Sequence, residues 1–337
     1  WQPRSITCFI RCCCPTKTGY PKQNSYAVST MRIAVMGAGG VGGCLGALLA
    51  QSGADVTLVS RGENLRAMQQ KGIQLFQPSG SFTVPDNASG DSSQIGPVDL
   101  VLFAVKTYQI PEAVQAMRPM IGPNTQIVTL QNGVDSADEL VAEFGAGRVL
   151  PGTSYSIASI ESPGVIGQQS QTARIVFRRE DGQLTDEAMS VKAALVPAID
   201  AELTEDITIV LWSKFLLTAP ANAINATARF PITRLIQTDG DRALLSGAME
   251  EVVAVGLASG VNIDPEAIAK GFRFMESLPQ DQRLSMLDDI EAGRPLELEA
   301  QSGAVVRIGR RVNVPTPINN SLYALLLPHK DGTPTPS

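Results

Sequence analysis

Residues 32–42 read RIAVMGAGGVG, and this stretch decides the fold of the chain. The apolar run at 32–36 is rich in strand-forming residues and predicts a buried parallel strand. The glycine loop follows at once, and GCLGALLAQSG then predicts a small-residue helix that ends near Gly53. A second strand is expected in DVTLVSR at 55–61. This order of strand, glycine loop, helix and strand is typical of a dinucleotide-binding unit.

Each glycine of the loop has a separate physical reason. Gly37 permits a tight turn, Gly39 lets the backbone approach a pyrophosphate, and Gly42 lets the helix pack closely on the strand. The helix N-terminus offers free N–H groups and a positive dipole end to phosphates. A purely structural turn is the alternative. We expect a cofactor site formed by Gly37, Gly39, Gly40, Val41 and Gly42.

The end of the second strand indicates which dinucleotide binds. NAD enzymes usually carry Asp or Glu there, which binds the ribose 2′-hydroxyl and would repel a 2′-phosphate. Here the strand ends in Ser60 and Arg61, which can donate hydrogen bonds and positive charge to that phosphate. The pattern therefore predicts NADPH/NADP+ rather than NADH, although an ordinary surface arginine would look the same.

Strand and helix continue to alternate towards the C-terminus. Residues 99–105 predict a buried strand that ends at Lys106, and a helix is expected from about Pro111 to Met120. Another strand at 126–130 leads into Asn132. Ligands of open α/β sheets sit at such strand ends, so Lys106 and Asn132 are expected to line a cleft. Turn chemistry alone could also explain Asn132, which precedes a glycine.

The second half of the chain changes character. Residues 152–178 look like antiparallel strands that close the first domain, and from about Thr204 the pattern turns helical. We expect a Rossmann-type α/β domain over 31–203, an all-helical domain over 204–330 with a cleft between them, and a tail at 331–337. The expected helices are 204–229, 240–259, 264–276, 300–311 and 317–327.

The first expected helix of this half carries a polar stripe on an otherwise apolar surface. At about 100° per residue one narrow face holds Lys214, Thr218, Asn222, Asn225 and Arg229. This predicts a mostly buried helix whose polar face lines a cavity, and the alternative is a face that meets solvent. Pro220 lies within this helix and is expected to kink it.

A second polar segment, LSMLDDIEAGRPLELEAQSG at 284–303, is acidic and rich in turn formers. Taken alone, it is best interpreted as a solvated loop with helix caps. Its candidate polar groups are Ser285, Asp289, Arg294, Glu297 and Glu299.

The first thirty residues differ from the rest. They hold four basic and no acidic side chains, and four of the five cysteines. They could be a targeting peptide, a cysteine cluster that binds metal or carries lipid, or an upstream region translated ahead of a true start at Met31. We favour the third interpretation and expect residues 1–30 to be disordered.

Composition excludes several function classes. The 337 residues carry a net charge of -6, which argues against a nucleic-acid surface, and no run of 18 apolar residues predicts a membrane span. The single histidine, His329, argues against a Ser-His-Asp triad and a histidine-rich metal site. Only Cys44 lies beyond residue 30, which fits a protein of the reducing cytoplasm without a disulfide framework.

Several spaced motifs together resemble the ketopantoate reductase family over essentially all of 31–328. They are GAGGVGG at 37–43, AVKTYQ at 104–109, LQNGV at 130–134, WSKFLLTAPANAINA at 212–226 and SMLDDIEAGRPLELE at 285–299. The resemblance implies a helical domain like that of 6-phosphogluconate dehydrogenase. It also implies NADPH-dependent reduction of 2-dehydropantoate (ketopantoate) to pantoate, on the way to pantothenate.

The resemblance also implies roles for matched residues. Lys214 matches the catalytic lysine, which donates a proton to the C2 carbonyl oxygen as hydride arrives from the nicotinamide. Glu297 matches the active-site glutamate, which contacts substrate and cofactor, and Lys106 matches a lysine near the cofactor. Positions that contact substrate or cofactor correspond to Asn132, Thr218, Asn222 and Ser285.

One matched position departs from the family. Thr218 stands where the family typically has a substrate-contacting asparagine, so reduction of another 2-keto acid is the alternative function. A non-catalytic NADPH-binding regulator is a third hypothesis, and it would not need Lys214 or Glu297. The expected partner is a small 2-keto acid, with no metal, nucleic acid or membrane, and the chain is expected to be a monomer or homodimer.

Overall fold

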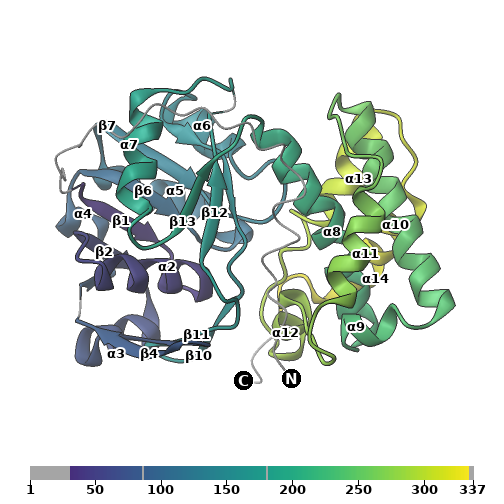
Figure 1. The fold of residues 1–337 in the computed structure, drawn as a ribbon, viewed down its shortest axis with the longest axis horizontal. Coiled ribbons are helices and arrows are strands. Elements are labelled where there is room, and N and C mark those ends of the chain that lie inside the picture. The colour runs from purple at the N-terminus through teal and green to yellow at the C-terminus, as the bar shows by residue number, and fades with distance from the viewer. Residues whose placement is uncertain (1–30, 86, 180, 334–337) are drawn as a thin grey trace.

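A fully parallel six-stranded sheet forms the centre of the N-terminal half (Figure 1). The computed structural model describes residues 31–85, 87–179 and 181–333, so the expectation for 1–30 lies outside the described residues. The strands run in the order β5-β2-β1-β6-β7-β8. Their bounds are β1 Ile33–Met36, β2 Val56–Val59, β5 Ala88–Ser89, β6 Val98–Phe103, β7 Ile121–Thr129 and β8 Val149–Leu150.

Apolar layers cover both faces of this sheet. In β1, Val35 packs into one cluster with Leu45 of α2, whereas Ala34 packs into another with Met117 of α5. Because successive strand residues point to opposite faces, a strand buried on both sides must be apolar throughout. The helices of this half are α2 Gly40–Gln51, α3 Gly62–Lys71, α4 Ser92–Ile95, α5 Ile110–Met117 and α6 Asp138–Phe144. The predicted Rossmann-type sheet is therefore confirmed.

Two smaller sheets complete the N-terminal half. One has the order β10-β11-β3-β4 and the other the order β13-β12-β9. The prediction of antiparallel strands over 152–178 is correct for the pairs β10–β11 and β9–β12, but β11 also pairs with β3 in parallel, and β12 with β13. The bounds are β3 Ile73–Gln77, β4 Gly80–Val84, β9 Gly152–Ser154, β10 Ala158–Ser162, β11 Val165–Gln168, β12 Arg174–Phe177 and β13 Asp200–Leu203, with α7 Asp186–Leu195 beside them.

The C-terminal half consists of helices around a long central one, α8. Its core includes Phe215 of α8 and Met249 of α10. The helices are α8 Ile207–Ala228, α9 Ile232–Leu235, α10 Asp239–Ala258, α11 Ala267–Glu276, α12 Ser285–Glu291, α13 Ser302–Arg311 and α14 Pro317–Leu326. An all-helical second half is thus confirmed. The helix predicted at 264–276 corresponds to α11, which begins three residues later, at Ala267.

Helix α8 is long and apolar enough to cross a membrane by length and composition alone. Within the described chain, however, 56% of that apolar stretch is buried by the packing of the protein itself. Pro220 lies inside α8, which continues past it to Ala228. The apolar character of α8 is therefore explained by its place at the centre of the helical half.

Candidate active site

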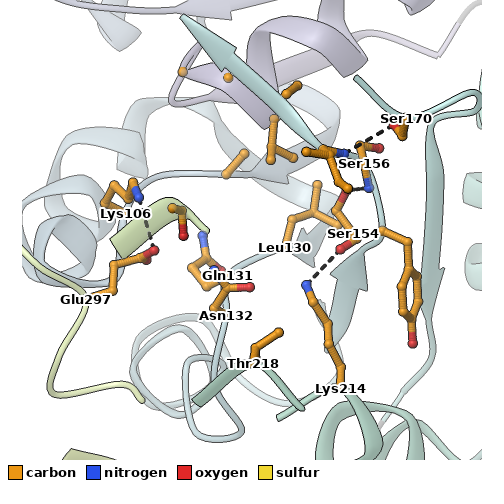
Figure 2. A pocket seen from close by; sticks show the side chains of 18 of the residues that line it. Lys106, Leu130, Gln131, Asn132, Ser154, Ser156, Ser170, Lys214, Thr218 and Glu297 are labelled. Atoms are coloured by element: carbon orange, nitrogen blue, oxygen red, sulfur yellow. Dashed lines mark hydrogen bonds and ion pairs between the residues drawn. The ribbon is translucent and has the colours of Figure 1, made fainter. Parts of the chain in front are cut away.

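A cleft of about 2410 Å³ lies between the two halves of the molecule. The carboxyl ends of β1, β6 and β7 form one wall, and residues of α8 and α12 form the opposite wall. In Figure 2, Lys106 and Glu297 lie on one side of this cleft and Lys214 on the other, with Gln131 and Asn132 between them.

The glycine loop between β1 and α2 forms one end of the cleft. Gly37 has φ +98°, and a Cβ there would lie 2.7 Å from a methyl of Val105. A Cβ on Gly42 would lie 2.1 Å from the carbonyl oxygen of Gly37, so Gly42 is required by the packing of α2 on the loop. A Cβ on Gly39 would instead meet nothing within 4 Å. The loop is therefore packed from behind and open towards the cleft.

This loop fits the phosphates of a dinucleotide. Gly39 is the N-cap of the 12-residue helix α2, and no side chain caps that end. The first N–H groups of the helix and its positive dipole end are thus left for an anion. Gly37, Gly39, Gly40 and Val41 line the cleft, whereas Gly42 is buried behind them.

Ser60 and Arg61, after β2, lie beside the glycine loop and line the cleft. The Arg61 guanidinium is 2.6 Å from a carboxylate oxygen of Glu112 in an exposed ion pair. Asn64, which the sequence did not single out, donates to the Ser60 hydroxyl at 3.2 Å and to the Ala38 carbonyl at 2.8 Å. Asn64 therefore ties the residues after β2 to the glycine loop.

Lys106, three residues after β6, joins the two halves through a charge network built on two buried carboxylates. Its Nζ is 2.9 Å from Asp289 and 3.2 Å from Glu297. Glu297 also accepts from the Thr107 N–H at 2.9 Å, and Arg294 Nε donates to Asp289 at 2.8 Å. Burial lowers the pKa of Lys106, but the carboxylates of Glu297 and Asp289 outweigh it, so that pKa lies above its ordinary value.

Lys214 reaches from α8 to the edge strand β9 of the N-terminal half. Its Nζ donates to the Ser154 carbonyl at 2.7 Å (Figure 2) and to Thr153 Oγ1 at 3.0 Å. The ammonium lies 5.7 Å from the centre of the Tyr155 ring. Burial lowers the pKa of Lys214 to about 8, against a smaller raising effect of Glu297. A lysine with this pKa can both hold and release a proton near neutral pH.

The polar stripe of α8 divides into two parts. Lys214, Thr218 and Asn222 line the cleft, as the stripe predicted. Asn225 is fully buried and accepts from the Leu284 N–H at 3.0 Å, so it fixes the start of α12 rather than lining the cavity. Arg229 is the left-handed C-cap of α8 and lies outside the cleft. The cavity prediction is therefore wrong for Asn225 and Arg229.

Asn222 both lines the cleft and holds α12. It lines the cleft, but its amide accepts from the Met286 N–H at 3.2 Å and donates to the Thr218 carbonyl at 3.0 Å. The N–H groups at the start of a helix lack partners within the helix, and here side chains of α8 satisfy two of them near the start of α12. Helix α12 is thereby fastened to α8.

The acidic segment 284–303 is not simply a solvated loop, because residues 285–291 form α12. Ser285 begins this helix and lines the cleft with Asp289, Arg294 and Glu297. Asp289 and Glu297 are each only 6% exposed, which explains why their charges must be paired. Glu299 lies apart and accepts from the Tyr323 hydroxyl at 2.9 Å.

Gln131 and Asn132 follow β7 at the floor of the cleft. Gln131 Nε2 donates to the carbonyls of Phe103 at 2.8 Å and Val105 at 3.2 Å, so it holds the ends of β6 and β7 together. The side chain of Asn132 lies beside Gln131 in the cleft (Figure 2). In the described ranges no group of three His, Cys, Asp or Glu side chains could hold a metal ion.

Two sequence patterns of one family match this chain. The pattern described as "Ketopantoate reductase PanE/ApbA" matches residues 33–181, and "Ketopantoate reductase PanE/ApbA C terminal" matches 206–330. A protein named 2-dehydropantoate 2-reductase from Mesorhizobium japonicum is 28% identical over 318 residues, which cover 88% of this chain and 97% of the relative.

Solved structures give the same result. A structure titled 2-dehydropantoate 2-reductase from Geobacter metallireducens is 30% identical, with a TM-score of 0.84 over 88% of this chain and 99% of that one. A PanE/ApbA family ketopantoate reductase from Ralstonia eutropha is also 30% identical, with a TM-score of 0.82 over 89% and 98% of the two chains. The chain therefore belongs to the ketopantoate reductase family of oxidoreductases.

Proposed function

We propose that this protein catalyses the NADPH-dependent reduction of 2-dehydropantoate (ketopantoate) to pantoate in pantothenate biosynthesis. The observation that carries the proposal is Lys214, a cleft lysine whose pKa burial lowers to about 8, on the wall opposite the glycine loop. Reduction of a carbonyl group needs a proton at the oxygen, and an ammonium of this kind can supply it. The names of the relatives support the substrate.

The proposed cofactor site extends from the glycine loop to the centre of the cleft. Gly37, Gly39, Gly40 and Val41 with the N-terminus of α2 would bind the pyrophosphate, and Gly42 would keep the helix close. Ser60 and Arg61 would bind the 2′-phosphate, since the exposed Arg61–Glu112 pair costs little to open. The rest of the cofactor would be contacted by Lys106, Asn132 and Glu297. When bound, the nicotinamide supplies the hydride.

The residues of the chain provide the rest of the chemistry. Lys214 would donate its proton to the C2 carbonyl oxygen and stabilise the negative charge that develops there. Glu297, held by Lys106 and the Thr107 N–H, would orient substrate and cofactor. Asn132, Thr218, Asn222 and Ser285 would contact the substrate. Closure of the two walls would exclude water from the reacting atoms.

The alternative is the same reaction on another 2-keto acid. Thr218 lies in the cleft beside Lys214 (Figure 2). Its side chain is shorter than asparagine and carries a hydroxyl in place of an amide, so it would offer a substrate more room and different hydrogen bonds. We further propose a cytoplasmic protein that acts as a monomer or homodimer. The lone described cysteine, Cys44, is buried and unpaired with another cysteine, which supports a reducing compartment.

The test is NADPH oxidation, followed by absorbance, with ketopantoate, with a panel of other 2-keto acids and without substrate. Preference for ketopantoate supports the proposal, and preference for another acid supports the alternative. Lys214→Ala should lower turnover on the order of a hundredfold or more, because the acid and its charge are lost. Tight NADPH binding without turnover of any acid would instead indicate a regulator.

A further inference from the structure

The ammonium of Lys214 is held by the other half of the molecule. Its two acceptors, Thr153 Oγ1 at 3.0 Å and the Ser154 carbonyl at 2.7 Å, are consecutive residues of β9. Strand β9 lies at the edge of its three-stranded sheet, and among the described strands it is hydrogen-bonded to β12 alone. An edge strand leaves polar backbone groups without a strand partner, so its carbonyls can accept from a side chain. Thr153 itself is 1% exposed, so its hydroxyl occupies a fixed place.

We propose that Thr153 is a positioning residue for the reduction, whose hydroxyl oxygen, with the Ser154 carbonyl, fixes the Lys214 ammonium in the cleft. This inference rests on the proposed function, since it assigns Lys214 the role of proton donor. Thr153 acts only through Lys214, because its side chain is buried beneath the ammonium rather than among the residues that line the cleft.

The number of hydrogen-bond donors favours this role. A lysine ammonium has three N–H donors and a flexible four-carbon stem. Two of the three are used on β9, by Thr153 and Ser154, which leaves one to point towards a substrate oxygen. If the Thr153 acceptor were lost, one more donor would be released and the ammonium could turn away from the substrate.

Within the described chain, burial and one carboxylate shift the pKa of Lys214. Glu297 raises its pKa, while burial lowers that pKa more strongly. The Tyr155 ring lies near this ammonium and also near Arg174 of β12, whose guanidinium is 5.6 Å from the ring centre and is paired with Glu202 and Asp200. An acceptor such as Thr153 stabilises the charged form of lysine. Removal of this acceptor should therefore lower the pKa of Lys214 further.

The experiment compares Thr153→Val, which has nearly the same shape and no hydroxyl, with Thr153→Ser, which keeps it. Two profiles are measured across about pH 6 to 10: kcat/KM for NADPH-dependent reduction, and acetic anhydride labelling of Lys214 in the cofactor-free protein, quantified by mass spectrometry. Thr153→Val should move both to lower pH by about one unit, the shift expected for one lost charged hydrogen bond, and lower kcat about tenfold. Thr153→Ser should retain both wild-type profiles.

Thr129→Val is the matched control. Thr129 is also a buried threonine beside β9, where its hydroxyl accepts from the Gly152 N–H at 3.2 Å, but it is not one of the two acceptors of the Lys214 ammonium. Its loss should leave the pH profiles in place, whatever it does to thermal stability. If valine prevents folding at position 153, Thr153→Ala removes the same oxygen with a smaller side chain and gives the same test.

The outcomes separate this inference from the proposed function. If Thr153→Val keeps both wild-type profiles while Lys214→Ala loses turnover, Lys214 keeps its role and the role of Thr153 is refuted. If Thr129→Val shifts the profiles as far as Thr153→Val, the effect is general and the inference is also wrong. If Lys214→Ala turns over normally, the proposed mechanism itself fails, and the labelling profile still reports whether Thr153 holds Lys214.

Discussion

Two glycines of the same loop should respond to alanine in opposite ways. Gly39 has φ -79° and ψ -157°, an extended conformation with the negative φ that alanine also adopts, and its added methyl group would project into open space. Gly42 would place the methyl group 2.1 Å from the Gly37 carbonyl oxygen and 3.1 Å from the Ala104 and Val35 side chains. We therefore expect Gly39→Ala to affect ligand binding and Gly42→Ala to affect stability.

The size of each effect can be worked out from these distances. At Gly42 the helix must move by more than about 1 Å to restore van der Waals contact, and overpacking of this kind costs about 3 kcal/mol. For the N-terminal half (31–203) as the unfolding unit, that lowers the melting temperature by about 6–12 °C. Gly39→Ala should keep or slightly raise the melting temperature, because alanine restricts the unfolded chain by about 0.4–1 kcal/mol.

Binding should follow the reverse order. The methyl group of Gly39→Ala would stand where a pyrophosphate must approach the backbone, and we expect the Kd for NADPH to rise at least about tenfold, or about 1.4 kcal/mol. Thermal unfolding and fluorescence titration with NADPH measure the two quantities on the same samples. Wild-type NADPH affinity in a folded Gly39→Ala protein would refute the placement of the phosphates on this loop.

Three further predictions concern charges in the cleft. If Lys214 donates its proton with a pKa of about 8, the reduction rate should be maximal below pH 8 and fall about tenfold for each pH unit above it. The rate of Lys214→Arg should show no such fall over this range. A wild-type rate that is constant to about pH 9.5 would contradict the assignment. Arg61→Ala should weaken NADPH binding by about tenfold or more and NADH binding much less. Arg66, further along α3 and paired with Glu63, is the control, and Arg66→Ala should change the affinity for neither cofactor. Equal losses of NADPH and NADH affinity in Arg61→Ala would exclude a 2′-phosphate contact. Asp289→Asn should lower the free energy of unfolding in urea by about 2 kcal/mol, because Lys106 and Arg294 would lose their buried carboxylate partner. As a control, Asp288→Asn breaks an exposed ion pair with Arg283 and should lower it by less than about 1 kcal/mol. Similar losses in both variants would show that the Lys106 network contributes little to stability.

Local patterns were sufficient to predict the nucleotide-binding unit. β1, the glycine loop, α2 and β2 are contiguous, and each of their constraints acts between neighbours in the sequence or on one strand. The apolar stretch of α8 was likewise recognised because its period is local. The hairpin of β3 and β4 was missed, since β3 is completed by β11, about 90 residues further along the chain.

The site needed the fold as well. A helical wheel gives the direction of a side chain but not what lies opposite it at each height along the helix, so Asn225 and Arg229 were assigned to the cavity with Lys214. Helix α12 escaped prediction because Asn222 and Asn225 of α8 satisfy its first N–H groups from 59 to 64 residues away. The roles of Asp289 and Thr153 depend on partners 183 and 61 residues distant, and no spacing rule links them.

The clamp formed by Asn222 and Asn225 has a consequence for how this enzyme can change over evolutionary time. Because α12 is fastened to α8, Thr218, Lys214 and Ser285 belong to a single rigid wall, and the glycine loop, Arg61 and Lys106 belong to the opposite one. Under the proposed function, a substitution at Thr218 would therefore change the space on the α8 wall without a direct contact to the glycine loop or Arg61 on the opposite wall. If the proposed sites hold, a directed-evolution library confined to the Thr218 region of α8 should yield new acid specificities while the glycine loop and Arg61 keep their sequence and their cofactor preference.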